Sequence, residues 1–162
     1  MTLTIPMRLM TPVRLLRSLR KNPVILQAVL QNVTVSQAAK SLDEPGEWSI
    51  LEVLYHLHEL EEFFLQRVQK ILQEEYPQLP LHENSAPLAR DMKYRQGYIA
   101  ICASFFTTRQ TLIQTLSDLS EEQWMRTGIH DGIFSVTLKE VVLQVIMHDI
   151  DHIEQIAHIL NT

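Results

Sequence analysis

The segment from Val136 to Leu160 repeats apolar residues at spacings of three and four, the periodicity of one face of an α-helix. The apolar set is Leu138, Val141, Val142, Val145, Ile156, Ile159 and Leu160. A helix with such a stripe buries it against other elements of the fold. His148 and His152 fall inside the stripe. We therefore expect both imidazoles to point into the protein.

His148 and His152 are four residues apart, which places their side chains on one helix face, about 5–6 Å apart at Cβ. A buried imidazole needs a hydrogen-bond partner or a metal ion, because unpaired polar atoms in a core cost about 1–3 kcal/mol. Imidazole is also the commonest metal ligand in proteins. The pair is thus compatible with two satisfied core histidines or with two ligands of one divalent ion. A third ligand would decide between them.

The length of the chain, 162 residues, suits one compact domain with its own hydrophobic core. We expect residues 1–162 to form that domain, with residues 1–21 as an N-terminal extension packed on or beside it. Cys102 is the only cysteine, which excludes an intramolecular disulfide and thiolate-rich zinc sites. It lies in an apolar stretch without a recognisable base, so we predict a packing role. A reducing, cytoplasmic setting fits these features.

Membrane and nucleic-acid partners are not expected. No apolar run approaches the about 18–20 residues that cross a bilayer, and Pro6, Arg8 and Pro12 interrupt the N-terminus before a signal-peptide core. Residues 1–42 hold six basic residues and no acidic one, although the chain carries a net charge of −5. This segment could be a transit peptide or contact an anionic surface, but we expect its basic residues at 14–21 to rest against the acidic remainder. The overall acidity argues against duplex nucleic acid.

The pattern of breakers and caps predicts an all-α protein. Glycine is scarce, at four residues, and no stretch shows strand alternation bounded by turns. Asn22 and Pro23 match an N-cap and first helical position, which predicts a first helix to about Asn32, with a possible helical piece over residues 12–20 before it. Residues 33–42 could be a further turn or an irregular connector.

Three capping boxes organise the rest of the chain. Ser49 with Glu52 starts a second helix that is expected to run to about residue 75. A third helix is expected over about residues 88–117. Its predicted buried residues are Ile99, Phe105, Phe106, Leu112, Ile113 and Leu116. Ser120 with Gln123 opens a short turn.

The last part of the chain contains two glycines and the third capping box. Gly128 and Gly132 predict a loop. Thr137 with Glu140 caps the fourth helix, which carries the paired histidines. Four principal helices predict a four-helix bundle, in which metal sites are built from inward side chains of facing helices.

Candidates for a third ligand come from the remaining histidines. These are His56, His58, His82, His130 and His158. Two of them fall in predicted loops, at 82 and 130, and the one at 158 lies off the face of His152. His56 and His58 flank the apolar stripe of the second helix on opposite sides, about 100° from its centre. Helix geometry alone leaves the choice between these two open.

Two motifs resemble those of a known family. They read Trp48-Ser49-x-x-Glu52-x-x-x-His56-Leu57 and His148-Asp149-x-x-His152-x-x-Gln155-Ile156, with Thr137-Leu138-x-Glu140 between them. Their order and separation resemble the DinB-like family of metal-binding four-helix bundles, over about residues 22–160. The resemblance implies the bundle fold and a three-histidine metal site formed by His56, His148 and His152.

Neighbouring carboxylates are candidates for supporting roles. Glu52 lies one turn before His56 and could orient a ligand or accept a proton, although the capping box already uses its carboxylate. Asp149 could accept a ring N–H from a ligand histidine. Asp151 points away from His152, so we expect it in solvent.

Three neutral imidazoles leave a divalent ion with open positions, as in catalytic sites, and we expect zinc or nickel. The resemblance implies either transfer of a low-molecular-weight thiol such as bacillithiol, mycothiol or glutathione to a small electrophile, or metal-dependent hydrolysis. A thiol or water bound to the ion loses its proton more readily, and we favour the thiol transferase, with a metal-bound thiolate as the nucleophile. The alternative is a non-enzymatic metal-binding bundle for sensing, stress response or structure. Either protein could be a homodimer.

Overall fold

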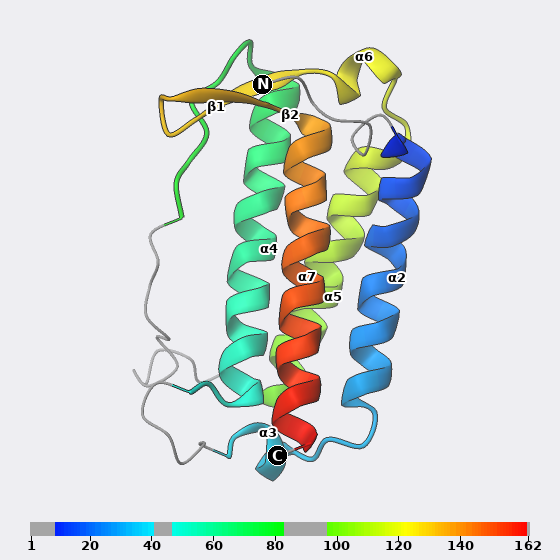
Figure 1. Ribbon diagram of the computed structural model, residues 1–162, viewed down its shortest axis with the longest axis vertical. Helices are drawn as coiled ribbons and strands as arrows, with labels where there is room; N and C mark the ends of the chain where they lie inside the picture. The colour runs from blue at the N-terminus through cyan, green and yellow to red at the C-terminus, as the bar shows by residue number, and fades with distance from the viewer. Residues whose placement is uncertain (1–8, 41–46, 83–96, 162) are drawn as a thin grey trace.

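The computed structural model describes residues 9–40, 47–82 and 97–161. Its four long helices lie side by side as a bundle (Figure 1). They are α2 (Pro12–Leu30), α4 (Ile50–Gln73), α5 (Tyr98–Ser117) and α7 (Leu138–Asn161). The shorter elements are α3 (Val35–Ala38), α6 (Glu121–Trp124), β1 (Thr127–His130) and β2 (Phe134–Thr137). The predicted all-α class and four-helix bundle are confirmed, with one small hairpin added at an end of the bundle.

The helices are arranged so that α4 packs against α5 and α7, and α2 packs against the same two helices. Helices α2 and α4 therefore occupy opposite corners. Figure 1 shows that α2 and α7 run in one direction and that α4 and α5 run in the other. The facing surfaces of α4 and α7 are the part of the bundle that concerns function.

Local capping sets where the helices begin. At the start of α4, the Ser49 hydroxyl accepts from the Glu52 N–H at 3.2 Å, and the Glu52 carboxylate accepts from the Ser49 N–H at 2.6 Å. The predicted box that opens α6 is present, with Ser120 as the N-cap. At the start of α7, Thr137 and Glu140 make the same reciprocal pair, at 3.2 and 2.7 Å. These three predictions are confirmed because capping depends only on residues three apart.

Helix α2 corrects two expectations. It begins at Pro12, with Thr11 as its N-cap, and continues through Pro23 to residue 30, so Asn22 is not a cap. Leu15 and Leu19 are buried in the core. Residues 12–21 are therefore the first half of a bundle helix, which includes the possible helical piece over residues 12–20, and are not an extension packed on or beside the bundle. Residues 1–8 lie outside the described part.

A proline within a helix removes the N–H that would bond to the carbonyl four residues earlier. For Pro23 that carbonyl belongs to Leu19. It instead accepts a hydrogen bond from Nη1 of Arg109, in α5, at 3.3 Å. Because the missing donor is replaced from another helix, the proline does not end α2.

The predicted loop around Gly128 and Gly132 is a β-hairpin, which the sequence reasoning missed. The turn contains Asp131 and Gly132 with φ of 55° and 64°, and the N–H of Ile133 donates to the carbonyl of His130 at 3.0 Å. Asp-Gly is a strong hairpin signal because both turn positions need positive φ. The strands have only four residues each, which is too short to show clear alternation.

The third helix differs in part from its prediction. The described residues place α5 at Tyr98–Ser117, and residues 88–96 of the predicted helix lie outside the described part. Ile99 is 74% exposed, so its predicted burial is wrong. Phe105, Leu112 and Leu116 are buried as expected.

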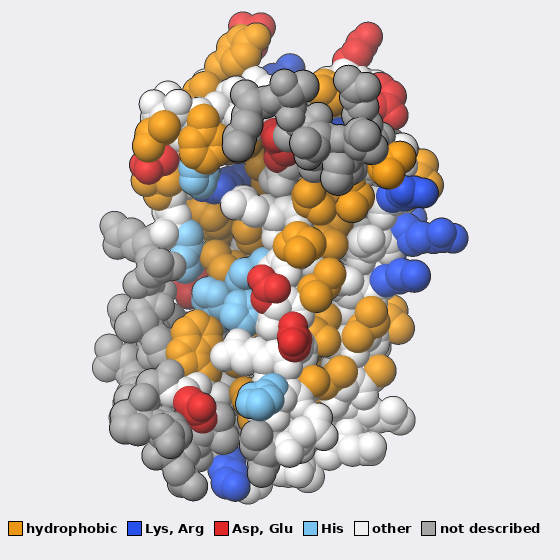
Figure 2. Space-filling model, viewed as in Figure 1, with side chains coloured by type: hydrophobic (Ala, Val, Ile, Leu, Met, Phe, Trp, Pro, Cys, Tyr) orange, Lys and Arg blue, Asp and Glu red, His pale blue; other side chains and the backbone are white. Residues whose placement is uncertain are grey.

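The basic residues of α2 are exposed and have no acidic partner among the described residues. They are Arg14, Arg17, Arg20 and Lys21. No ion pair from them is found within residues 9–40, 47–82 and 97–161. Figure 2 shows Lys and Arg side chains projecting into solvent along the flank where α2 lies. The expected pairing is therefore wrong for the described residues. No helix among them is long and apolar enough to span a bilayer.

Candidate metal centre

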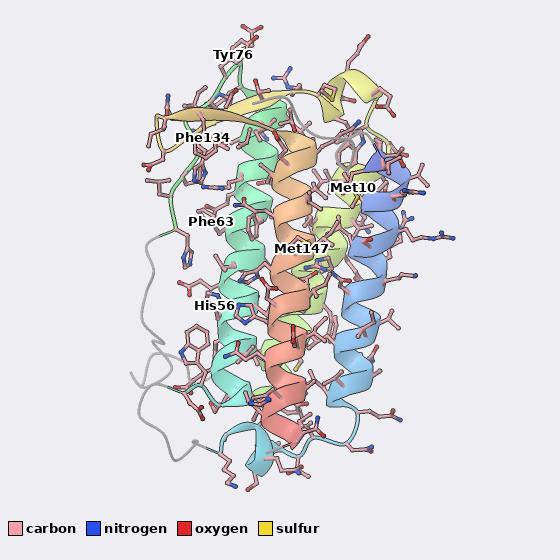
Figure 3. All side chains as sticks on the ribbon, in the orientation of Figure 1. Met10, His56, Phe63, Tyr76, Phe134 and Met147 are labelled. Carbon is pink, nitrogen blue, oxygen red and sulfur yellow. The ribbon has the colours of Figure 1, made fainter. Side chains whose placement is uncertain are left out.

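Three histidines from two adjacent helices meet at the middle of the bundle. His56 projects from α4 toward α7 (Figure 3), where His148 and His152 lie one turn apart. The Nε2 atoms of His56 and His148 are 3.1 Å apart. One ring nitrogen from each of the three lies within 4.8 Å of the others. The structure thus brings together the three residues that the family resemblance implied.

The packing of α4 decides which of His56 and His58 joins the cluster, a choice that helix geometry alone left open. Leu57, between them, is buried, and the two imidazoles leave α4 on opposite flanks. His58 faces Glu62, with 3.7 Å between its Nε2 and the carboxylate. Its Nδ1 is buried without a hydrogen-bond partner among the described residues. His58 is therefore a packing residue outside the cluster.

The cluster favours neutral imidazoles. Burial, followed by the proximity of His152 and other rings, lowers the pKa of His148 from 6.5 to about 3. Burial and the neighbouring His152 and His82 lower the pKa of His56 to about 4. Both rings are therefore uncharged at neutral pH, which is the form that binds metal.

The orientation of His152 is set by Gln155, one helical turn further along α7. Nδ1 of His152 and Oε1 of Gln155 are 2.7 Å apart. An amide oxygen only accepts, so Nδ1 carries the ring proton and Nε2 keeps a free lone pair. Holding the other ring nitrogen in this way is typical of metal-binding histidines. Gln155 is thus a supporting residue, and in the sequence it is visible only as a member of the motif that begins at His148.

The donor set fits a divalent ion. Among the residues that the structure describes, it has three imidazole nitrogens and no carboxylate, and at most one proton can lie between the Nε2 atoms of His56 and His148. Imidazole suits zinc, nickel, iron and copper. Three protein ligands leave positions open for an exogenous molecule.

Aromatic side chains surround the cluster. The indole of Trp48 lies parallel to the ring of His152, with centroids 6.2 Å apart and 6° between the planes, and meets His56 edge-on at 5.0 Å. Phe64 approaches His148 at 6.2 Å. All three cluster histidines are only half-buried. Figure 2 shows histidine side chains gathered at the surface in the middle of one face, so the cluster is open to solvent.

The carboxylates near the cluster have only in part the roles that were expected of them. Asp149 is buried and accepts from Arg109 at 2.8 and 2.9 Å and from Asn22 at 3.0 Å, and no bond to a ligand ring is found among the described residues. The predicted role of Asp149 as an acceptor for a ligand histidine is therefore wrong. Glu52 is used in the cap of α4, and Asp151 is exposed as expected.

Beneath the cluster lies a buried ionic network that sequence reasoning missed. Arg109 in α5 is 1% exposed and contacts Glu61 of α4 at 2.5 and 2.7 Å as well as Asp149 of α7. Burial opposes the charge of Arg109, but hydrogen bonds and charge from the two carboxylates outweigh it and raise its pKa. Burial raises the pKa of Glu61. An arginine among apolar residues of α5 was the only signal in the sequence.

Cys102 is half-buried against the core. Burial raises the pKa of its thiol to about 11, which disfavours the reactive thiolate. This agrees with the predicted packing role.

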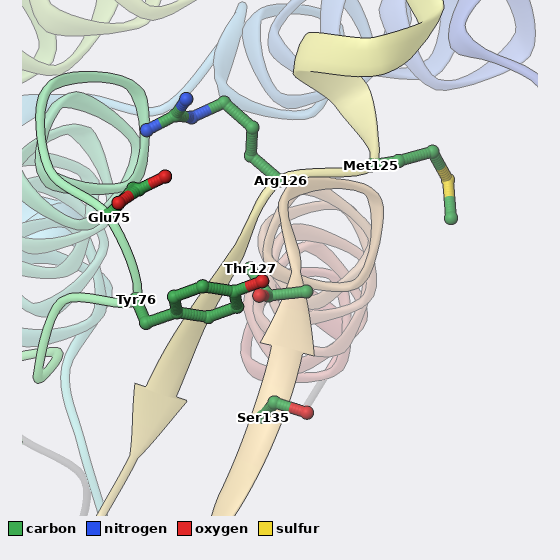
Figure 4. A pocket seen from close by; sticks show the side chains of 6 residues that line it. All are labelled: Glu75, Tyr76, Met125, Arg126, Thr127 and Ser135. Atoms are coloured by element: carbon green, nitrogen blue, oxygen red, sulfur yellow. The ribbon is translucent and has the colours of Figure 1, made fainter.

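A separate shallow pocket lies beside the hairpin (Figure 4) and contains none of the three histidines. Its lining residues are Glu75, Tyr76, Met125, Arg126, Thr127 and Ser135. Arg126 donates to the carbonyls of Ile71 and Glu74 at 2.8 and 2.6 Å. Its guanidinium therefore caps backbone carbonyls at the C-terminal end of α4.

Comparisons with known proteins agree with this architecture. YfiT from Bacillus subtilis, described as a probable metal-dependent hydrolase with an unusual four-helix bundle topology, has a similar solved structure. The TM-score is 0.78 at 20% identity, covering 91% of this chain and 85% of YfiT, so the likeness shows the fold. No curated protein matches the chain significantly. The family model of the DinB superfamily matches residues 18–156. The chain therefore belongs to the DinB superfamily.

Proposed function

We propose that this protein is a metal-dependent enzyme that transfers a low-molecular-weight thiol to a small electrophile, with a divalent ion held by His56, His148 and His152. The observation that carries the proposal is the grouping of three imidazole nitrogens within 4.8 Å at a solvent-open face. When bound, such an ion lowers the pKa of a coordinated nucleophile, so that the nucleophile is available at neutral pH.

The surroundings of the cluster support a thiol over water as the nucleophile. A thiol has a pKa near 8.5, whereas that of water is about 15.7, so a thiol depends less on a protein base. The carboxylate of Glu52 bonds to the backbone of Ser49, and that of Asp149 bonds to Arg109 and Asn22. Both carboxylates are therefore already hydrogen-bonded within the fold. Bacillithiol, mycothiol and glutathione are candidate thiols, and zinc or nickel the candidate ions.

The residues around the ion have separable roles. His148 and His152 supply ligands from one turn of α7, and His56 supplies the third from α4. Gln155 fixes the proton on Nδ1 of His152. Trp48 flanks two of the three rings and limits the approach of solvent from its side.

Metal-dependent hydrolysis is the second candidate. It is favoured by the structural likeness to YfiT, whose description names a probable metal-dependent hydrolase. The same three histidines would serve, with water in place of the thiol. A non-enzymatic metal-binding bundle is the remaining class.

The experiment that tests the proposal begins with chelator-treated protein that is reconstituted with zinc or nickel. Metal content is measured, and conjugation of glutathione, bacillithiol or mycothiol to a chlorinated aromatic electrophile is followed. His152→Ala should lose both metal and conjugation, whereas His158→Ala, an exposed histidine on the same helix, should keep both.

Three other outcomes would change the proposal. Hydrolysis of model esters or amides that requires His152, without conjugation, would replace thiol transfer by the second candidate. Stoichiometric metal without turnover in either assay would leave a non-enzymatic protein. Failure to bind metal would overturn the whole proposal.

A further inference from the structure

His82 lies beside the metal centre but outside its ligand set. Its ring meets His56 edge-on, with centroids 6.1 Å apart, and meets Phe63 edge-on at 5.3 Å. Among the described residues, the group of nitrogens that could share one ion contains His56, His148 and His152. Figure 3 shows His56 and Phe63 along α4, with Phe63 nearer the hairpin. His82 therefore adds a fourth imidazole at the edge of the site.

The backbone that leads to His82 is held by hydrogen bonds to residues that are distant in the sequence. The carbonyl of Pro77 accepts from Ile129 at 2.7 Å, and the N–H of Leu79 donates to the carbonyl of Ile129 at 2.8 Å. Two residues before His82, the carbonyl of Pro80 accepts two bonds from one guanidinium of α4.

That guanidinium belongs to Arg67. Its Nε and Nη2 donate to Pro80 at 3.0 and 2.8 Å, and Nη2 is also 3.0 Å from Nδ1 of His130 in the hairpin. Cζ of Arg67 lies 4.5 Å from the ring centre of Phe63, and the Phe63 ring packs on His82. Helix α4 and the hairpin together hold the position of His82.

We propose that His82 binds the nucleophile of the reaction, by a hydrogen bond from its ring N–H to the anionic molecule that shares the ion with the three histidines. This inference rests on the proposed metal site. A neutral imidazole always carries one N–H donor. No hydrogen bond to either nitrogen of His82 is found within residues 9–40, 47–82 and 97–161, so its donor is not used by the described part of the fold. A ring held edge-on to a ligand histidine can reach an exogenous molecule on that side of the ion.

The test uses cobalt(II) in the reconstituted protein and azide as the anionic probe, both followed by the visible spectrum of the cobalt. His82→Phe keeps an aromatic ring against Phe63 but removes the N–H, and His82→Gln restores a donor. His158→Ala is the matched control. All four proteins, wild type included, should bind cobalt within about twofold of one another. Azide should bind about fivefold more weakly to His82→Phe, a typical effect of one hydrogen bond, and His82→Gln should recover most of this loss.

The contrary outcomes are distinct. Equal azide affinity in the wild type and His82→Phe would show that His82 only packs, and would overturn the inference while leaving the metal site intact. Loss of cobalt from His82→Phe to the extent seen for His152→Ala would make His82 a fourth ligand and would also overturn it. A wild type that binds no cobalt would overturn the proposed metal site and this inference with it.

Discussion

Arg109 and Asp149 are joined by two hydrogen bonds of 2.8 and 2.9 Å, and Asp149 directly follows His148 of the histidine cluster. The same guanidinium bonds to Glu61 of α4 and to the carbonyl of Leu19 in α2. One side chain of α5 thus contacts the other three long helices. A buried ionic network centred on Arg109 thus lies in the interior of the bundle, next to the histidine cluster.

Replacing Arg109 should destabilise the protein strongly. Arg109→Met keeps much of the volume but leaves two buried carboxylates without their cation, and breaking such a pair costs about 3–5 kcal/mol. The free energy of unfolding from urea denaturation measures this loss. Arg17→Met, at an exposed position of α2, should change it by less than about 0.5 kcal/mol. Equal effects of the two substitutions would show that the network contributes nothing specific.

The histidine cluster should make the metal-free protein sensitive to acid. The pKa values of His56 and His148 fall from 6.5 to about 4 and about 3, so the unfolded chain binds more protons than the folded one between these values. The stability contributed by the neutral rings is complete above pH 6.5 and is lost as the pH falls toward 4 and 3.

We therefore expect the urea midpoint of chelator-treated protein to decrease from pH 7 to pH 5. The double substitution His56→Gln and His148→Gln should flatten this dependence, because glutamine does not titrate. His158→Gln, on the exposed side of α7, should leave the slope as in the wild type. A double variant with the wild-type slope would contradict the assignment of the acid sensitivity to the cluster.

Trp48 should report metal binding by fluorescence. Its indole lies parallel to the ring of His152, with centroids 6.2 Å apart, whereas Trp124 is buried in the hydrophobic core at 1% exposure. A paramagnetic ion such as nickel(II) or cobalt(II) at the histidines should quench Trp48. The quenching should disappear in Trp48→Phe and persist in Trp124→Phe, and the reverse pattern would place the ion elsewhere.

A side chain at position 128 should destabilise the protein while Leu79 is present. A Cβ on Gly128 would lie 2.7 Å from Cδ2 and 2.8 Å from Cγ of Leu79, so Gly128→Ala should cost about 1–3 kcal/mol by overpacking. In the background of Leu79→Ala the same change should cost less, because the contact has been removed. Additive effects in thermal or urea unfolding would show that the hairpin moves away from Leu79 without cost.

The parts of the fold that depend on near neighbours could be predicted from the sequence. The starts of α4, α6 and α7 follow from capping boxes, and the pairing of His148 with His152 follows from the 3.6-residue repeat. The hairpin was missed because its strands are short, although its Asp131-Gly132 turn was visible in the sequence. The prediction at Pro23 is wrong because local rules make a proline a helix boundary. The N–H that the proline lacks is replaced by a donor from α5, which lies far away in the sequence.

By itself, therefore, the sequence determined the presence of four long helices, the caps of α4, α6 and α7, and a histidine pair on one face, since each depends on residues within about one turn of one another. Only the tertiary structure decided which histidine of α4 joins the pair, because His56 and His58 are equivalent on an isolated helix. It also decided the partners of Asp149 and the place of His82. Those contacts join residues far apart in the chain, and their geometry exists only once the helices have packed.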